Sequence, residues 1–424
     1  MTGRRLPFQN LGPREWRNLA VAALFAFYAV YLGMGLYRNG PFVYVGSDYL
    51  GFWGAGYIAN TRGYAHAYDL NVLREIQEPL VPAPDDPDLV FAPLPMLAPP
   101  IFILPFQALA LFPANWSLFA WTVFNALLLF LYLRFFGRRI APESLSDRLS
   151  VMMCFSFPAF WTLAWGQVNI LLMACVGEFL RAMVTEKPFQ AGFWLGGLWL
   201  KPQTLVLILP ALLLQRSWKA LVAFGMISLL VWGSSIGIGG PEASRRMLDL
   251  WLSSAVGMPT NSPQFMSNWR MVGIYLSSLV GPPVGWGIAL TGLGLTVLVA
   301  LSFWIRPRSP RSPQFGIALL GTLVATGAAT WHSHIHVMTI LIPPLLYLKS
   351  LRRLTVGELD LWLFLMPALV FAGFLLNLMG RFGLLPFISP EGLPTAGFAM
   401  SVTGFGLNLY FLLWSVQRIY GEPG

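Results

Sequence analysis

Residues 115–139 read NWSLFAWTVFNALLLFLYLRFFGRR, an apolar run that ends in a cluster of arginines. An α-helix needs about 20 apolar residues to cross a hydrocarbon core of roughly 30 Å. Positive residues accumulate on the cytoplasmic side of such helices. The stretch therefore predicts a transmembrane helix at about 115–136 whose arginine-bearing end faces the cytoplasm.

The same combination of an apolar run and a basic cluster recurs along the chain. The clusters are Arg134, Arg138, Arg139 and Arg148; Arg216 and Lys219; Arg306, Arg308 and Arg311; and Lys349, Arg352 and Arg353. If all of them are cytoplasmic, both termini are cytoplasmic and 12 spans are predicted, at about 18–37, 115–136, 149–164, 168–184, 188–200, 203–215, 219–238, 284–305, 314–331, 335–348, 358–378 and 395–416. This topology places 19 of the 27 Lys and Arg residues on the cytoplasmic side, as the charge bias requires.

The composition excludes a soluble protein. Charged residues make up 11% of the chain, hydrophobic residues make up 56%, and the mean hydropathy is +0.63. Typical globular proteins carry about 25% charged residues. We therefore expect an all-α polytopic protein, a single integral domain over residues 1–424 in the plasma (inner) membrane. The net charge of +9 lies in short loops and does not indicate nucleic acid as a partner. Cys154 and Cys175 lie in apolar runs and indicate neither a disulfide framework nor a metal site.

Two large loops are predicted on the outer face, at 38–92 and 239–268. The aromatic residues of Tyr49–Asn60 recur at helical spacing, which predicts an amphipathic helix lying in the membrane interface. A second short helix is predicted around Leu73, and a third at Glu242–Leu252. No internal repeat is evident, which disfavours transporters that are built from repeats.

The apolar segment 91–112 is an exception among the apolar runs. It holds Pro93, Pro95, Pro99, Pro100 and Pro105. Each proline removes a helical hydrogen bond that lipid cannot replace. We therefore expect a re-entrant or surface-lying segment on the outer face. The short spans at 188–200 and 203–215 could likewise be broken or buried helices.

Asp48 is the first candidate for chemistry, because it follows the first span in Gly46-Ser47-Asp48-Tyr49 and leads into a helix. An aspartate immediately before a helix is also a preferred N-cap. For Asp48 the catalytic and the capping interpretation both stand, and the two roles are compatible. For Asp69, which precedes the next short helix, the capping interpretation is favoured.

Three of the four histidines lie close together, as His332, His334 and His336, at the predicted outer end of a span. Residues i and i+4 share a helical face, so His332 and His336 should converge. A zinc site is conceivable, but neither a cysteine nor a carboxylate accompanies the cluster. Hydrogen bonding to a polar or anionic ligand is the favoured role, with interfacial histidines of no special role as the alternative.

Lys201 is a lone cation between two apolar runs. Ionisable residues at membrane depth are costly and tend to mark sites. Pro202, at the start of the next helix, directs free backbone N–H groups outward, which suits an anion. The alternative is a lysine that extends to the interface at the end of a span.

Arg270 is a further cation on the predicted outer face, and it could bind a phosphate. Residues 165–169 form a polar corner whose Gln and Asn are either helix-end hydrogen bonders or contacts to sugar hydroxyls.

Taken together, these motifs resemble the glycosyltransferase-C superfamily, and specifically glycosyltransferase family 87, the polyprenol-phosphate-mannose-dependent mannosyltransferases. The resemblance rests on five segments in order: Ser47-Asp48 to Tyr68-Asp69, Phe91-Ala92-Pro93-Leu94-Pro95, Gly166-Gln167-Val168-Asn169, Lys201-Pro202-Gln203, and the histidine run that leads to Pro343-Pro344. It implies a glycosyltransferase-C-like fold with interfacial helices in the outer loops.

The resemblance also implies a set of site residues. Asp48 is the expected catalytic base. The expected ligands of the donor phosphate are Lys201, Arg270, His336 and His334, and the expected sugar or acceptor contacts are Tyr49, Trp53, Gln167, Asn169 and His332. Which histidine takes the role that the family assigns is open. No metal or cofactor is expected.

The predicted function is an inverting transfer of a sugar, most simply mannose, from a polyprenyl-phosphate donor to a lipid or glycan acceptor at the extracytoplasmic face, among membrane lipids. Neither a Gly-rich phosphate loop nor a paired-Asp site for a nucleotide sugar is present. A lipid or sugar transporter or flippase is one alternative, and it would favour charges inside the bundle. A ligase or polymerase of surface polysaccharide is another, and it does not require Asp48.

Overall fold

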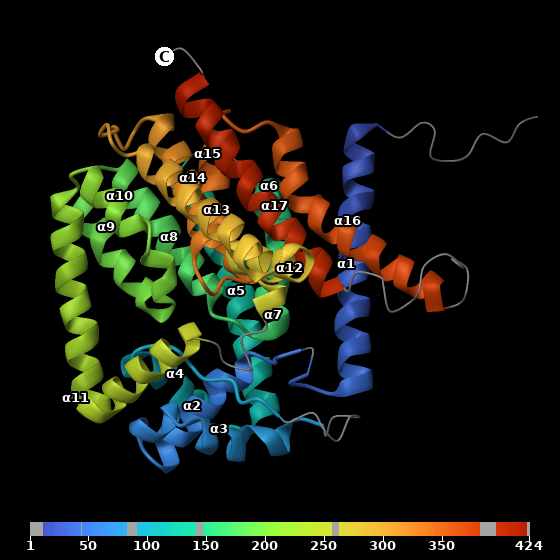
Figure 1. Ribbon diagram of the computed structural model, residues 1–424, viewed down its shortest axis with the longest axis vertical. Coiled ribbons are helices and arrows are strands. Elements are labelled where there is room, and N and C mark those ends of the chain that lie inside the picture. Colours follow the sequence, from blue (N-terminus) through green and yellow to red (C-terminus); the bar gives the residue numbers. More distant parts are fainter. Residues whose placement is uncertain are drawn as a thin grey trace, which may run out of the picture.

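The computed structural model describes residues 12–43, 45–82, 91–140, 147–256, 263–381 and 396–421, and every regular element in these ranges is helical (Figure 1). The helices are α1 (Pro13–Asn39), α2 (Tyr49–Thr61), α3 (Leu70–Gln77), α4 (Leu104–Leu109), α5 (Ala114–Ile140), α6 (Asp147–Cys154), α7 (Phe157–Trp165), α8 (Asn169–Val184), α9 (Pro188–Leu195), α10 (Ile208–Leu214), α11 (Trp218–Val256), α12 (Trp269–Val280), α13 (Pro282–Ser302), α14 (Pro313–Ala329), α15 (Ile342–Ser350), α16 (Val356–Arg381) and α17 (Ala396–Val416). Short 3₁₀ turns connect several of them, including η3 (Pro100–Ile103), η4 (Gly196–Leu200), η5 (Pro202–Leu205) and η8 (Ile335–Leu341).

Six of the described helices are long and apolar enough to cross a membrane, which confirms a helical membrane protein. They comprise Arg14–Tyr37, Ala114–Ile140, Trp218–Ser254, Pro282–Ser302, Val356–Gly373 and Gly397–Gly421. The other six predicted spans also fall on helices, but these are short or interrupted, as where η8 gives way to α15 beside Pro343 and Pro344. Where such a helix lies in the interior, as α14 does, protein groups instead of lipid can satisfy the backbone. Twelve crossings therefore stays a prediction.

The loops that the charge pattern assigns to the cytoplasm contact one another. Arg17, at the start of α1, bonds Asp360 of α16 at 2.7 Å, and Asp360 follows the fourth basic cluster (Lys349, Arg352 and Arg353) in the sequence. Arg311 bonds Glu186, which follows α8, at 2.7 Å. The predicted cytoplasmic loops thus share one end of the bundle. The end of α17 and the first turns of α1 also lie at one end in Figure 1. The predictions for the two termini themselves fall on residues 1–11 and 422–424, which lie outside the described residues.

The predicted outer loops gather at the opposite end, where α2, α3 and α4 lie (Figure 1). Arg246 of α11 approaches Asp69 at 3.7 Å. Trp251 of the same helix donates its indole N–H to the carbonyl oxygen of Leu97 at 3.2 Å. The structure therefore supports the division of the loops into two sets. Which set faces the cytoplasm stays a prediction.

Helix α2 differs from the amphipathic interfacial helix that was predicted over Tyr49–Asn60. The helix is present, but ten of its 13 residues are buried. Two glycines explain the difference, because a Cβ on Gly51 would lie 2.8 Å from the carbonyl oxygen of Leu94, and one on Gly56 would lie 2.2 Å from that of Phe106. Helix α2 therefore packs directly against the backbone of the proline-rich segment and lies inside the protein.

The other short helices of the outer loops follow the predictions more closely. Helix α3 occupies the predicted position around Leu73. The helix predicted at Glu242–Leu252 is the second half of α11, which continues past a kink at Gly240, where φ is +76°. In the proline-rich segment only η3 and α4 form, and neither is long enough to cross a membrane. The buried amide of Gln77 holds this segment, donating to the Leu94 carbonyl at 2.9 Å and accepting from the Leu94 N–H at 2.8 Å.

Candidate active site

The predicted outer end of the protein contains a cavity of about 660 Å³. Its wall comes from several segments that are separated in the sequence. Among the residues that line it are Ser47, Asp48, Phe52, Leu97, Trp165, Gln167, Lys201, Gln203, Val206, Trp251, Phe265, Trp331, His332, His334 and His336. The carboxylate, the lone lysine and the three histidines that the sequence singled out are thus brought to one cavity.

Asp48 has a carboxylate that is not used as a helix cap. It occupies the N-cap position of α2, but its side chain makes no capping hydrogen bond. Instead its Oδ2 accepts a hydrogen bond from Nε2 of Gln167 at 2.7 Å. Asp69 behaves in the opposite way, because its carboxylate accepts from the backbone N–H groups of Asn71 and Val72 at the start of α3. Capping therefore explains Asp69 and leaves Asp48 free for chemistry.

Two glycines bring Asp48 and Gln167 together. Gly46, with φ +77°, donates its N–H to the carbonyl oxygen of Ala164 at 2.7 Å and ties the loop to the end of α7. Gly166 ends α7 in the left-handed conformation, and a Cβ there would lie 2.5 Å from that of Tyr49. The side-chain oxygen of Gln167 accepts from the next backbone N–H at 3.3 Å, so its NH₂ group is directed to Asp48.

The charges of Asp48 and Lys201 influence each other across the cavity. Burial raises the pKa of Asp48, while the hydrogen bond from Gln167 and the charge of Lys201 act in the opposite direction. Burial lowers the pKa of Lys201 to about 8, and the charge of Asp48 opposes this change. Near neutral pH Lys201 is therefore mainly an ammonium group that can bind an anion. Its charge and the hydrogen bond from Gln167 both favour the carboxylate form of Asp48.

The three histidines form a chain of ring contacts. The ring centroids of His332 and His334 are 5.0 Å apart, and those of His334 and His336 are 5.6 Å apart. Nε2 of His336 lies 3.5 Å from Nζ of Lys201. The rings converge for a different reason from the predicted one, because η8 begins only at Ile335 and the backbone of His334 is extended, so the helical i, i+4 argument does not apply.

His334 is a neutral hydrogen-bonding group near pH 7. Burial lowers its pKa to about 4. Its Nδ1 lies 3.2 Å from the carbonyl oxygen of Phe265, which suits an N–H donor at that nitrogen and leaves Nε2 as an acceptor. Within the described residues, no group of three His, Cys, Asp or Glu side chains is arranged to hold a metal ion.

Four of the predicted site residues lie behind the cavity wall. The guanidinium of Arg270 lies 5.0 Å from the ring centroid of Trp331 and is 3.5 Å from that residue's carbonyl oxygen. The hydroxyl of Tyr49 bonds Ser117, the indole of Trp53 bonds the carbonyl of Phe112, and the amide of Asn169 lies 3.5 Å from the hydroxyl of Thr162. None of the four is among the residues that line the cavity. Their predicted contacts with the substrate stay predictions.

Several cavity residues were not singled out from the sequence. Trp251 comes from the second outer loop and Phe265 from the segment before α12, and no local pattern distinguishes either from other aromatic residues. Gln203 could have been found, since it stands two residues after Lys201 in a motif that had been noted. The side chain of Trp165 packs against His336 with ring centroids 5.5 Å apart.

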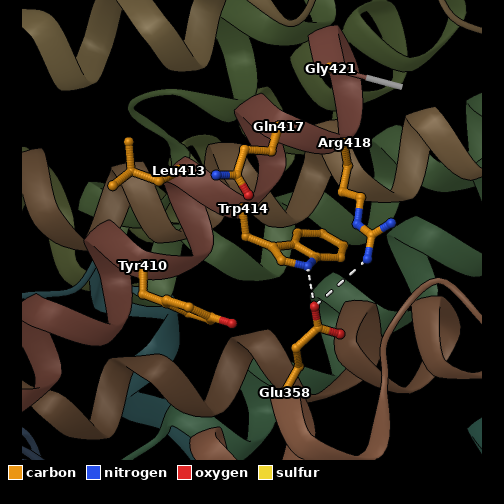
Figure 2. A pocket seen from close by; sticks show the side chains of 7 residues that line it. All are labelled: Glu358, Tyr410, Leu413, Trp414, Gln417, Arg418 and Gly421. Carbon is orange, nitrogen blue, oxygen red and sulfur yellow. Dashed lines mark hydrogen bonds and ion pairs between the residues drawn. The ribbon is translucent and has the colours of Figure 1, made fainter. Parts of the chain in front are cut away.

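A second cavity, of about 490 Å³, lies between the start of α16 and the end of α17 (Figure 2). Its carboxylate, Glu358, accepts from the indole N–H of Trp414 at 2.7 Å and pairs with Arg418 at 3.8 Å. The other oxygen of Glu358 accepts from the backbone N–H of Thr355 at 2.5 Å. Both oxygens of the Glu358 carboxylate are therefore engaged by groups of the protein.

Comparison with known proteins identifies one family. The model of one family, glycosyltransferase family 87, matches residues 97–329, more than half of the chain. Neither a curated protein nor a solved structure showed a significant match. The matched region includes Gln167 and Lys201, whereas Asp48 and the histidines lie outside it.

Proposed function

The chain belongs to glycosyltransferase family 87, and from this premise we propose that it transfers a sugar from a polyprenyl-phosphate donor at the outer face of the cell membrane. As a member of that family it is a membrane glycosyltransferase that takes a sugar donor and an acceptor. We propose that the donor is a polyprenyl-phosphate sugar, with mannose as the sugar. The acceptor is a lipid or glycan hydroxyl on the extracytoplasmic side.

One observation carries this proposal: Asp48, whose carboxylate caps no helix, lines the same cavity as Lys201. Asp48 accepts the proton of the acceptor hydroxyl, and the hydroxyl oxygen forms a bond to the anomeric carbon of the sugar. The bond from that carbon to the phosphate oxygen breaks, and its electron pair leaves with the phosphate. Because this is a single displacement, the anomeric configuration inverts.

Lys201 stabilises the charge that develops on the departing phosphate. His336, which lies beside Lys201, and His334, which lies beside His336, add nitrogens that can form hydrogen bonds to the phosphate. The remainder of the wall includes Phe52, Leu97 and Val206, which suit the isoprenoid part of the donor. A lipid-linked donor fits a protein of this kind, because its tail remains in the bilayer while the reacting head reaches the interface.

The pH dependence of transfer tests the role of Asp48. A general base acts when deprotonated, so the rate should fall as the pH is lowered through the pKa of Asp48. The hydrogen bond from Gln167 favours the charged form. In Gln167→Leu that bond is lost, the pKa rises further, and the acidic limb of the kcat/KM profile should move to higher pH. Gln417→Leu, in the second cavity, is the control that should leave the limb in place. An acidic limb that Gln167→Leu does not move would exclude Asp48 as the titrating base.

Cysteine labelling tests the face of the membrane. Arg245 and Arg311 are equally exposed, each with 66% of its side chain accessible, and the topology places them on opposite sides. In a background without Cys154 and Cys175, an impermeant maleimide should label Arg245→Cys in intact cells. It should label Arg311→Cys only after permeabilisation. The reverse pattern would put the cavity on the cytoplasmic side.

A further inference from the structure

Gln203 presents an unused amide to the larger cavity. It lies in η5, two residues after Lys201, and is half-buried in the cavity wall. Its side chain makes no hydrogen bond to any residue in the described part of the chain. Its amide is therefore open to the cavity and can bond a ligand or water there.

Two other glutamines, Gln167 in the cavity wall and Gln77 beside it, already form hydrogen bonds within the protein. The amide of Gln167 bonds Asp48 and the backbone of Val168. The amide of Gln77 bonds the backbone of Leu94 on both sides. Each of these amides therefore positions part of the wall. Gln203 differs from them, because its donor and its acceptor are both free for a substrate.

The position of Gln203 relative to Lys201 is fixed by the local backbone. Pro202 begins η5, and the hydroxyl and the N–H of Thr204 both donate to the carbonyl oxygen of Lys201, at 2.7 and 3.0 Å. These bonds close a tight turn that holds the two residues together. The cation and the neutral amide thus extend into the cavity from one short turn of backbone.

The chemistry of an amide suits a sugar hydroxyl better than a phosphate. A phosphate oxygen accepts hydrogen bonds, so it uses only the NH₂ group of an amide. A hydroxyl both donates and accepts, so it can use the NH₂ group and the oxygen. In a sugar joined to phosphate through its anomeric carbon, the C2 hydroxyl is the one on the adjacent carbon. A residue next to the phosphate ligand is therefore placed to contact C2.

We propose that Gln203 binds the C2 hydroxyl of the donor sugar and sets the sugar specificity of the enzyme. This inference rests on the proposed function, since it takes Lys201 as the ligand of the donor phosphate. Mannose and glucose differ in configuration only at C2. The hydrogen bonds of Gln203 to the correct epimer would be lost with the wrong one, because its C2 hydroxyl points in the other direction.

The test compares polyprenyl-phosphate mannose with polyprenyl-phosphate glucose as donors for the purified protein. In Gln203→Leu, kcat/KM for the preferred donor should fall roughly tenfold to a hundredfold. The ratio between the two donors should approach one. Inhibition by polyprenyl phosphate, which has no sugar, should stay as in the wild type. If Gln203→Leu fails to fold, Gln203→Asn takes its place in the test. It keeps an amide on a side chain shorter by one methylene, and it should also lower the ratio of kcat/KM between the two donors.

Lys201→Met in the same assay separates this inference from the proposed function. Loss of the cation should weaken inhibition by polyprenyl phosphate and leave the ratio between the two sugars largely intact. An unchanged donor ratio in both Gln203 variants would overturn the role of Gln203 while the phosphate site stood. Unchanged inhibition in Lys201→Met would instead overturn the phosphate site, and with it the proposed function.

Discussion

Asp48→Asn is expected to lower the rate of sugar transfer by roughly 10²–10⁴-fold, the range over which a general base acts. The amide has the shape of the carboxylate and still offers an oxygen to the NH₂ group of Gln167. It cannot take the proton of the acceptor hydroxyl, so the chemical step fails while the local structure persists. The measurement is the initial rate of the purified variant with a radiolabelled donor, together with its melting temperature in detergent.

Asp69→Asn is the matched control. Asp69 caps α3 by accepting from backbone N–H groups, and asparagine caps a helix about as well as aspartate. Its transfer rate should therefore stay close to that of the wild type. If Asp48→Asn were as active as the wild type, Asp48 would have only a structural role at the start of α2.

Lys201→Met has the second largest expected effect. A charge-assisted hydrogen bond is worth about 1.5–3 kcal/mol, which corresponds to a loss of roughly tenfold to a hundredfold in kcat/KM. Because charge on the phosphate grows toward the transition state, kcat should fall as well as donor affinity. Steady-state kinetics with varied donor measures both quantities.

The pKa of Lys201 adds a second measurement to this prediction. Since that pKa lies at about 8, the fraction of ammonium falls as the pH rises through 8, and activity should fall with it. Lys201→Arg keeps its charge over this range, because a guanidinium is not deprotonated there. The variant should therefore lack this alkaline limb, even if its rate at neutral pH is lower.

Arg270→Met is the useful comparison for Lys201. The guanidinium lies behind Trp331 and does not line the cavity, so its loss should affect thermal stability more than donor dependence. If Lys201→Met and Arg270→Met both kept the donor dependence of the wild type, the anion site would lie elsewhere, most directly among the three histidines.

The sequence predicted a helical membrane protein, and it singled out a carboxylate, a lysine and three histidines that the structure brings to one cavity, because both inferences depend on residue type. Long apolar runs need no context to indicate helices in a membrane, and a charged residue between two such runs stands out, as Lys201 does. Asp48 was found by the same contrast. The family was recognised from short motifs in order, and the matched region at 97–329 confirms it.

Packing geometry could not be predicted in the same way. The glycines of α2 were read as part of an interfacial helix, but their function is to let Leu94 and Phe106 approach, which depends on segments that follow 40 or more residues later. The spacing of the histidines implied a regular helix, although the backbone before Ile335 is extended. The direction of the Arg270 side chain likewise depends on Trp331, which sequence pattern alone does not place.

Transfer from two classes of donor tests the central claim most directly. Purified protein would be incubated with a lipid extract and either a radiolabelled polyprenyl-phosphate sugar or the corresponding nucleotide sugar, and the anomeric configuration of the product would be determined. We predict a labelled, inverted product from the polyprenyl-phosphate donor that disappears in Asp48→Asn, and none from the nucleotide sugar. Transfer from the nucleotide sugar with none from the lipid-linked donor would contradict the account.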